Sequence, residues 1–370
     1  MINQNLVDEL FPSLKEVTHL NNAGVSIPPV TAKKAMMEYF ENRMKGKFNV
    51  KDVMNKFKEF GKCITDLLGG GFQNYAYMPN TTAGINAIAN SIDYPTGSNI
   101  VICDLEFPAN YIPWLNLKNF FDVEVRVVKS KDGAAPVDEY IKLIDENTRM
   151  VAVSHVQFGT GYKIDIKKLA DAVHSVGGYI SLDIIQSAGC VDFKIPALDV
   201  DFAAGQATKW LLGPIGAGFI YVRDELLEKV KPRYMGWQGV KNTENFSFRE
   251  IEPASSAAKF QLGSPAMICY WGLTESLKVL LKFPGEAREK AALENADYLR
   301  KRLDEKGIGH LDFKPENRSA IVSCNVKDAE NLIKVLWKNN VICSVRDGNL
   351  RVSPHFYNSK DDIDRLMEFL

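Results

Sequence analysis

Apolar runs alternate with helical stretches between residues 75 and 225, and this alternation limits the possible folds more than any other feature of the chain. The expected strands are short and rich in Val, Ile and Leu: 99–104 (NIVICD), 123–128 (VEVRVV), 150–154 (MVAVS), 179–183 (YISLD), 202–204 (FAA) and 218–222 (GFIYV). Nearly continuous apolar strands are typical of a sheet that is covered on both faces. Helices are expected between the strands, for example over 82–92 and 166–176. This order predicts an α/β domain with a mainly parallel sheet.

The pattern changes after about residue 255. Two long amphipathic helices are expected first, then two short strands and a last helix: 268–281, 286–306, 320–325, 350–352 and 360–370. This order is typical of a smaller α+β domain. Because 370 residues exceed one typical domain, we predict a large domain over 1–255 and a small one over 256–370. Residues 1–20 can pack with the small domain.

Composition and charge exclude several classes of protein. The 45 Lys and Arg residues nearly cancel the 46 Asp and Glu residues, so charge does not favour nucleic acid or an anionic membrane. No apolar run approaches the roughly 18 residues of a membrane span, and MINQNLVDEL does not look like a signal peptide. The six cysteines are scattered without a close pair, which argues against disulfides and a metal site. We predict a cytoplasmic protein with no metal, nucleic-acid or membrane partner.

Lys209 is the most unusual residue of the large domain, because it lies in the nearly uncharged stretch from Phe202 to Val222. Lysine is rarely buried without a role, although it can also reach the surface on its apolar stem. A desolvated lysine loses its proton more easily and can form a Schiff base. The glycines that follow it do not match a dinucleotide fingerprint or a P-loop.

Other polar residues occupy places where ligands bind in such folds. Asp183 ends an expected strand, where a buried carboxylate is costly without a partner, and Gln186 follows it. Thr81 or Thr82 can cap a helix, and a helix N-terminus with hydroxyl groups is a ready phosphate site. Arg351 can grip a carboxylate in a bidentate fork. Taken one at a time, these residues also fit ordinary caps, loops and surface positions.

Together, these residues match the needs of pyridoxal 5'-phosphate (PLP) chemistry. The cofactor requires an anchor for its phosphate, a carboxylate for its ring nitrogen and a lysine for the Schiff base. An amino-acid substrate also requires a clamp for its carboxylate. The sequence therefore predicts a PLP-dependent enzyme that acts on an amino acid, since a purely structural interpretation needs four independent coincidences.

The sequence resembles the class V aminotransferases of PLP fold type I, a group that includes cysteine desulfurases, selenocysteine lyases, isopenicillin N epimerase and kynureninase. The resemblance extends from HLNNAGVSIPP near residue 19 to LRVSPHFYNSKDDIDRL near the C-terminus. Its most specific stretches are SLDIIQSAG, ATKWLLGPIGAGFIYV and LRVSPHFYN. It implies fold type I, with a large PLP-binding α/β domain and a small α+β domain.

The resemblance also implies roles at the cofactor. Lys209 corresponds to the lysine of the internal aldimine, which then shuttles the proton at the substrate carbon. Asp183 corresponds to the partner of the pyridine nitrogen, and Gln186 to the residue that hydrogen-bonds the ring hydroxyl. The other implied cofactor-binding residues are Thr81 and Thr82 at the phosphate, Phe107 against the ring, His155 and Gln157 in a lining loop, and Gln206 before the lysine.

Roles at the substrate and at a second subunit follow in the same way. Arg351 corresponds to the clamp for the substrate carboxylate, and Asn22 lies in a turn that borders the substrate. The stretch KFQLGSP resembles the family's "RFE-x-GT" segment, so Ser264 would reach the cofactor phosphate of a neighbouring subunit. This implies a homodimer with the site at the subunit interface.

The chain departs from the family pattern at several positions. Phe107 replaces a common histidine, and it can stack on a ring but cannot transfer a proton. Gln206, Ala207 and Thr208 replace a serine or threonine and a histidine before the lysine. Only SVRDGNL separates Cys343 from Arg351, which leaves little room for the mobile cysteine loop of desulfurases.

Several reactions stay open at this point. Removal of the α-proton can lead to transamination, β-elimination by a C–S lyase, or epimerisation. One alternative is a cysteine desulfurase that forms a persulfide on Cys343, although a buried structural cysteine fits NVICSV better. Another is a non-catalytic PLP-fold binding protein. Arg346 is either a second polar contact in the site or a surface arginine, and the surface position is the favoured interpretation.

Overall fold

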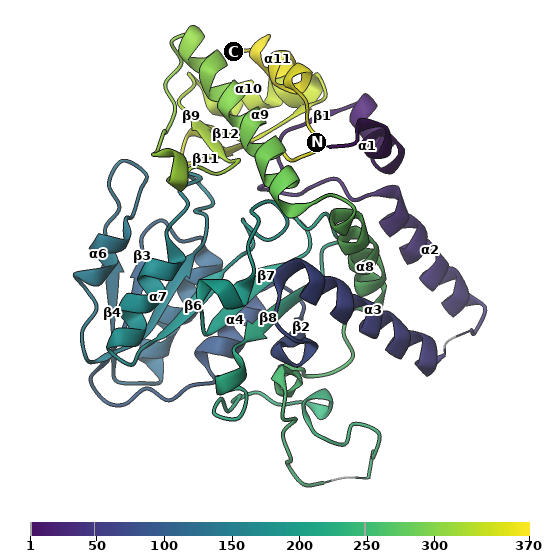
Figure 1. The fold of residues 1–370 in the computed structure, drawn as a ribbon, viewed down its shortest axis with the longest axis vertical. Helices are drawn as coiled ribbons and strands as arrows, with labels where there is room; N and C mark the ends of the chain where they lie inside the picture. The colour runs from purple at the N-terminus through teal and green to yellow at the C-terminus, as the bar shows by residue number, and fades with distance from the viewer. Residues whose placement is uncertain (1, 48, 248) are drawn as a thin grey trace.

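A seven-stranded sheet forms the centre of the large domain in the computed structural model, which describes residues 2–47, 49–247 and 249–370 (Figure 1). The strand order is β2-β8-β7-β6-β5-β3-β4. The bounds are β2 Tyr75–Met78, β3 Ser98–Cys103, β4 Val123–Val128, β5 Thr148–Ser154, β6 Tyr179–Asp183, β7 Phe202–Gln206 and β8 Gly218–Val222. Neighbouring strands from β7 to β4 are parallel, and only β8 runs against its neighbours. The predicted α/β class with a mainly parallel sheet is confirmed.

Helices cover both faces of this sheet, as the apolar strands require. On β3, Ile100 and Ile102 join the core on one face, whereas Val101 and Cys103 join the core on the other. The helices of the large domain and its flanks are α1 Gln4–Leu10, α2 Val30–Met44, α3 Val50–Leu68, α4 Thr81–Ala89, α5 Ile112–Asn116, α6 Val137–Ile141, α7 Ile166–Ser175 and α8 Met267–Leu281. Helices α4 and α5 supply one core, and α1, α3, α6, α7 and α8 supply the other.

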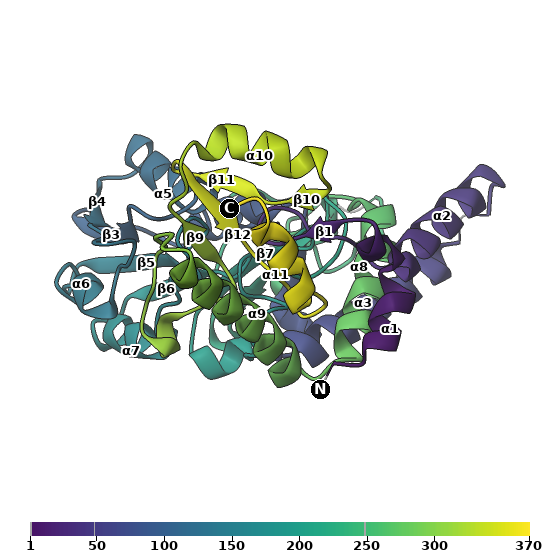
Figure 2. The same ribbon diagram turned by 90° about the horizontal axis from the view of Figure 1, so that it is seen from above.

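The C-terminal residues form a smaller layer above one end of the sheet (Figures 1 and 2). Its elements are α9 Gly285–Glu305, β9 Val322–Cys324, α10 Ala329–Lys338, β10 Val341–Ile342, β11 Ser344–Arg346, β12 Asn349–Val352 and α11 Lys360–Met367. The antiparallel order β11-β12-β9 forms its small sheet. Strand β1, Thr18–His19, pairs with β10, so part of the N-terminal segment lies in this layer.

Helix α8 packs with the large domain, although the predicted division placed it in the small one. Its residues Tyr270, Leu273 and Leu277 lie in the main core, and α8 packs directly on α2 and α3. The amphipathic pattern of a helix shows that one face is buried but not which domain buries it. In the packing, the small layer therefore begins near α9.

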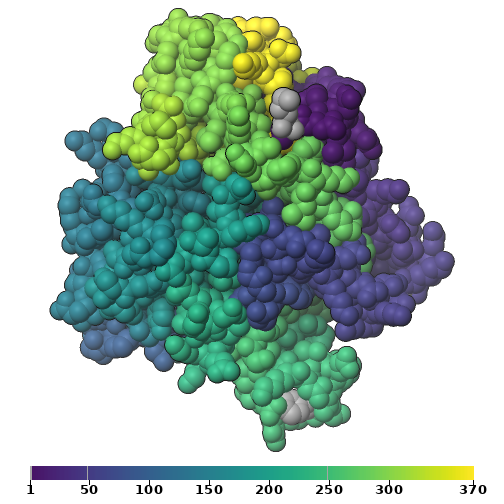
Figure 3. Space-filling view, in the orientation of Figure 1, coloured from purple at the N-terminus to yellow at the C-terminus, as the bar shows by residue number. Residues whose placement is uncertain are grey.

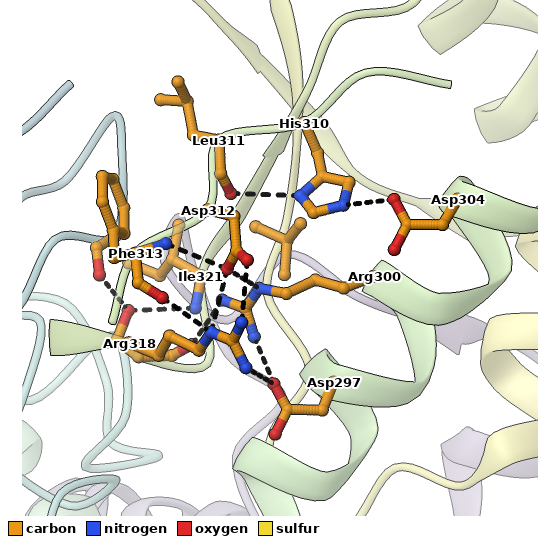
Figure 4. A network of polar contacts seen from close by, with 12 residues as sticks. Asp297, Arg300, Asp304, His310, Leu311, Asp312, Phe313, Arg318 and Ile321 are labelled. Carbon is orange, nitrogen blue, oxygen red and sulfur yellow. Dashed lines mark hydrogen bonds and ion pairs between the residues drawn. The ribbon is translucent and has the colours of Figure 1, made fainter. Parts of the chain in front are cut away.

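A network of arginines and aspartates fixes the loop that joins α9 to β9 (Figure 4). Arg318 binds Asp312 through two donors at 2.8 and 2.7 Å, and buried Arg300 donates to Asp297 at 2.8 Å and to the Ser319 carbonyl at 3.2 Å. Ser319 in turn donates to the Gly161 carbonyl at 2.7 Å, which ties the small domain to the loop after β5. This loop takes part in the site described below.

Two segments project from the body of the molecule. Helix α2 extends from one side, and residues 235–247 and 249–255 form a lobe at the lower end (Figures 2 and 3). Both carry exposed apolar side chains, including Met44, Phe40, Phe246 and Ile251. Within the described residues, no helix is both long and apolar enough to cross a membrane.

Candidate active site

Polar residues gather at one edge of the central sheet, where the parallel strands end. Strands β3, β5, β6 and β7 are parallel, so their carboxyl ends meet at this edge. Strand β2 runs in the same direction as β7, because both are antiparallel to β8. The first turn of α4, which follows β2, therefore lies at the same edge. Ligands of open α/β sheets bind at such carboxyl ends.

Lys209 follows β7 in a tight turn. Leu212 N donates to Lys209 O at 2.9 Å, and Leu212 itself has φ +59°, a left-handed conformation that costs energy for a leucine. Among the described residues, none forms a hydrogen bond or ion pair with the Lys209 amine, which lies 5.8 Å from the centre of the Phe107 ring. Burial lowers the pKa of Lys209, and the positive charges of Arg351 and Arg346 lower it further, whereas Asp183 opposes them.

Asp183 ends β6 and is 3% exposed. Its Oδ1 accepts a hydrogen bond from Ile185 N at 2.8 Å, and no described residue donates to its second oxygen. Burial raises the pKa of Asp183, and the nearby Glu106 raises it further. A buried carboxylate with a free oxygen is arranged to receive a cationic group.

Glu106 is a site residue that the sequence reasoning missed. It lies after β3, buried beside Asp183, and accepts from Ser154 Oγ (2.5 Å), Ser154 N (2.9 Å), Asn110 (2.8 Å) and Gln157 (2.8 Å). Burial raises its pKa, and these donors oppose the rise. The rule that selected Asp183, a polar residue at a strand end, points first to Asp104, because Glu106 lies three residues past the end of β3.

Gln186 and Trp210 form a rigid support around the lysine. Trp210 Nε1 donates to Gln186 Oε1 at 2.9 Å, and Gln186 Nε2 donates to Ala23 O at 3.1 Å. One Gln186 N–H therefore remains for a ligand. His355 Nε2 lies 3.1 Å from Trp210 O, and its Nδ1 accepts from Phe356 N at 2.8 Å. Because burial lowers the pKa of His355 to about 3, the ring stays neutral and donates from Nε2. The small domain thus holds the backbone beside Lys209.

Unpaired donors meet at the start of α4. Asn80 caps the helix by accepting from Ala83 N at 2.8 Å, and no described residue accepts from the N–H groups of Thr81 and Thr82. Thr81 Oγ1 is buried without a partner, and so is Thr208 Oγ1, directly before the lysine. Buried hydroxyls are rarely left unpaired, and a phosphate would satisfy both of them and the helix N-terminus. Thr208 is a further phosphate-site candidate, and Gln206 lies partly exposed at the end of β7.

Arg351 is almost completely buried without an acidic partner. It is 1% exposed, donates from Nε to Ser344 Oγ at 3.2 Å and from Nη1 to Phe158 O at 2.8 Å, and leaves Nη2 buried and unpaired. Burial lowers its pKa to about 9, and Arg346 adds to the effect. A buried guanidinium with a free nitrogen is suited to a carboxylate.

Three predicted residues are not brought into this arrangement. His155 directly follows β5, its ring packs on Phe193 with 5.0 Å between ring centres, and its Nδ1 is buried without a partner among the described residues. Asn22 uses both ends of its amide inside the protein, since Nδ2 donates to Ser353 O at 2.9 Å and Oδ1 accepts from Tyr357. Ser264 is exposed. Phe107 and Gln157, by contrast, lie next to Lys209 and Glu106 respectively.

These residues fit one molecule with a phosphate, a basic ring nitrogen, a ring face and a carbonyl carbon for the lysine, which is the set of groups that PLP carries. The comparisons with known proteins point in the same direction. The model of the family described as "Aminotransferase class-V" matches residues 18–366. The chain belongs to the class V aminotransferase family.

Curated relatives of this class V aminotransferase include two kinds of protein. An "Uncharacterized aminotransferase YcbU" from Bacillus subtilis is 27% identical over 96% of this chain and 94% of its own. A "Probable cysteine desulfurase" from Methanothermobacter thermautotrophicus is 27% identical over 97% of this chain and 95% of its own.

One solved structure with a similar fold contains the PLP cofactor. It is a mutant of C-DES with glycine covalently linked to the PLP cofactor, with a TM-score of 0.90, 20% identity, and coverage of 98% of each chain. The apo cysteine desulfurase from Thermococcus onnurineus has a TM-score of 0.89, 21% identity and coverage of 100% and 97%. The predictions of fold type I, of PLP as cofactor and of a PLP-dependent enzyme are confirmed.

Proposed function

We propose that this class V aminotransferase binds a small amino acid by its α-carboxylate at Arg351 and moves the α-proton with the amine of Lys209. The observation that carries the proposal is the unpaired Nη2 of buried Arg351, in electrostatic contact with Lys209, a partly buried lysine whose amine has no hydrogen-bond partner among the described residues. An amino acid supplies both a carboxylate for the guanidinium and an α-carbon next to it.

The protein's own residues can hold PLP in a single orientation. When bound, the cofactor acts as an electron sink that acidifies the α-carbon of the attached amino acid. The hydroxyls of Thr81 and Thr208 and the start of α4 would bind the phosphate, and Asp183 would keep the ring nitrogen protonated. The free N–H of Gln186 would reach the ring hydroxyl, and Phe107 would cover the ring face.

Lys209 is the acid–base group that the surroundings prepare for proton transfer. Its lowered pKa increases the fraction of neutral amine at ordinary pH, which a general base requires. The groups in electrostatic contact with it are Asp183, assigned to the ring nitrogen, and two arginines. A site with one base favours reactions in which the same lysine removes and returns the proton. We therefore favour transamination or β-elimination over a two-base epimerisation.

A persulfide mechanism on a cysteine has little support from the thiols. Cys343, the position weighed for it, is buried in the core of the small domain, and burial raises its pKa. Burial also raises the pKa of each of the other five cysteines, so none is prepared as a thiolate. The alternative of a non-catalytic binding protein also has little support. The site keeps Lys209, Asp183 and Arg351, and each of them has at least one polar atom without a partner among the described residues.

Deuterium exchange at the α-carbon tests the proposal directly. The PLP-loaded enzyme is incubated in D₂O with single L-amino acids, and proton NMR follows the α-proton and any keto acid that forms. At least one amino acid should exchange its α-proton. Elimination should give a keto acid over many turnovers without an acceptor, whereas transamination should stop at one equivalent of keto acid per enzyme unless a keto-acid acceptor is added. Cys343→Ser should leave the exchange rate unchanged within about twofold. Absence of exchange with every amino acid contradicts the proposal, and sulfur release that stops in Cys343→Ser supports the desulfurase alternative.

We also propose that the enzyme works as a homodimer. A surface pocket of about 440 Å³ beside α4 is lined by Leu262, Gly263 and Ser264, and Leu262 and nearby Ile215 are 56% and 69% exposed. Apolar patches of this kind are typical of interfaces, and Ser264 is the residue implied to reach a neighbour's phosphate. Sedimentation should give twice the 41.4 kDa chain mass, and Leu262→Asp should shift it toward the monomer. A monomer that keeps PLP and full turnover contradicts the proposal.

The predicted cytoplasmic location stays a prediction. All six cysteines are free thiols, as expected of proteins in a reducing compartment.

A further inference from the structure

Two arginines lie on one face of the hairpin formed by β11 and β12. In its register, Ser344 pairs with Arg351 and Arg346 pairs with Asn349. Paired residues of antiparallel strands share a face, and so do residues two apart on one strand. Arg346 and Arg351 are therefore diagonal neighbours on the same face. Arg351 donates to Phe158 O of the large domain, so this face is turned toward the site of Lys209.

Like charges at such positions repel each other unless an anion lies between or beside them. Arg346 is partly buried, and its one side-chain bond is a donation from Nη1 to the carbonyl of its neighbour Val345 at 2.6 Å. Neither arginine has an ion pair with an acidic residue in the part of the chain that the structure describes. The adjacent Asp347 is exposed and lies beside Gly159 instead.

The electrostatic effects of Arg346 extend to the centre of the site. Its positive charge acts on Arg351 and on Lys209, and it lowers the pKa of both groups. Arg346 thus belongs to the group of cations around the bound substrate and is not an isolated surface arginine. The surface position favoured from the sequence is not what the hairpin geometry supports.

Within the described residues, Arg346 is a cation on this face of the hairpin that the proposed function leaves without an anionic partner. The phosphate of the cofactor is assigned to α4 and Thr208, and Asp183 is assigned to the ring nitrogen. The α-carboxylate of an amino acid neutralises Arg351, and its amino group is used at the cofactor. Arg346 then still has no anion beside it, so the substrate that fits this face best brings a second negative charge.

We propose that Arg346 forms a second anion subsite, which selects amino acids with a short anionic side chain, such as a carboxylate or a sulfinate. The proposal rests on the function proposed above for the placement of the α-carboxylate on Arg351. Diagonal positions on a hairpin lie about 7–8 Å apart, and two long arginine side chains at this spacing can grip opposite ends of a four-carbon diacid. The competing arrangement is one carboxylate shared by both arginines.

Binding of amine-free ligands tests the subsite without any reaction. Isothermal calorimetry on the PLP-loaded enzyme compares succinate with succinamate, which has the same shape but only one negative charge. Succinate should bind at least about tenfold more tightly, which corresponds to about 1.4 kcal/mol. Arg346→Gln should reduce this ratio to near one, and Arg346→Lys should keep a preference because it keeps the charge. Arg351→Gln should weaken both ligands.

The matched control is Arg365→Gln, which removes an equal charge from α11, where Arg365 pairs with Glu368 at 2.6 Å. It should keep the succinate preference. Equal affinities of the wild-type enzyme for both ligands overturn the subsite, and so does an equal loss of both ligands in Arg346→Gln, which would mean a shared carboxylate. If succinate is preferred but no amino acid exchanges its α-proton, the proposed function fails while the subsite stands.

Discussion

Replacing Lys209 with alanine should abolish the visible absorbance band that PLP gives when it is bonded to the enzyme, and should lower turnover by at least about 10³-fold. The amine is the attachment point of the cofactor and the proposed proton carrier, and a positioned acid–base group alone contributes about 10²–10⁴-fold. The measurements are the visible spectrum of the protein after addition of PLP and removal of excess, and the α-proton exchange rate in D₂O.

Although Lys209→Ala should lower turnover, it should raise the stability of the protein without PLP. Burial lowers the pKa of Lys209 from its ordinary value of 10.5 to about 8 in the folded protein. The folded state therefore binds fewer protons than the unfolded state between these values, so wild-type stability rises with pH there. Lys209→Ala should raise the Tm of the apo protein at pH 7, and this gain should shrink toward pH 10. A lower Tm of Lys209→Ala at pH 7 would contradict the argument that the desolvated, unpaired amine of Lys209 destabilises the apo protein.

Lys259→Ala is the matched control, because Lys259 is a buried lysine with a structural partner. It is 5% exposed and donates to Leu227 O. Its removal leaves a buried carbonyl without a donor, which costs about 1–3 kcal/mol. This variant should lose stability but keep the visible band. A visible band that survives in Lys209→Ala and disappears in Lys259→Ala would mean that the wrong lysine was assigned.

The sequence predicted the central sheet well because its strands can be recognised from their own apolar residues. The inner strands are buried on both faces, so their residues are apolar regardless of what packs on them, and the predicted 179–183 and 218–222 match β6 and β8. The predicted 123–128 matches the edge strand β4, which its valines indicate although Glu124 is exposed. Strand β2 was not predicted, since YAYM lies beside a helix signal and is only four residues long. The domain assignment of α8 depends on which surface covers its apolar face, which a periodic pattern does not contain.

Among the candidate site residues, the sequence singled out most clearly those whose burial requires a ligand. An isolated lysine after an apolar strand and a carboxylate at a strand end both conflict with burial unless a ligand is present. Glu106 was missed because it lies three residues past the end of β3, where Asp104 is the first polar residue. The partners of Asn22 and His155 come from residues far away in the chain, so local sequence did not reveal that both ends of the Asn22 amide are occupied. The diagonal placement of Arg346 and Arg351 depends on the hairpin register, which the local sequence does not reveal.

Asp183→Asn should lower turnover by about 10²- to 10³-fold while the protein still folds and binds PLP. Removing one partner of a buried ion pair costs about 3–5 kcal/mol, and here the partner is the protonated ring nitrogen on which the electron sink depends. The asparagine oxygen can still accept from Ile185 N, so the local turn is kept. The measurements are the exchange rate in D₂O and the pH dependence of the visible band.

Apo stability separates this role from a structural one. Burial raises the pKa of Asp183 in the folded protein, so the folded state binds more protons than the unfolded state and wild-type stability falls as pH rises through that pKa. Asp183→Asn should remove this fall and should be at least as stable as the wild type at pH 8. A large loss of stability at pH 8 would indicate that the carboxylate is needed for folding.

Glu106→Gln gives the comparison that decides between the two buried carboxylates. Glu106 accepts from Ser154, Asn110 and Gln157, and an amide nitrogen in its place would face donors, which costs about 1–3 kcal/mol. This variant should lose stability but keep more turnover than Asp183→Asn, because the four hydrogen bonds place Glu106 behind the residue that meets the ring. If Asp183→Asn keeps full turnover and Glu106→Gln loses it without loss of stability, Glu106 is the partner of the ring nitrogen. The comparison of turnover and stability between these two variants therefore tests the geometry of the site independently of the identity of the substrate.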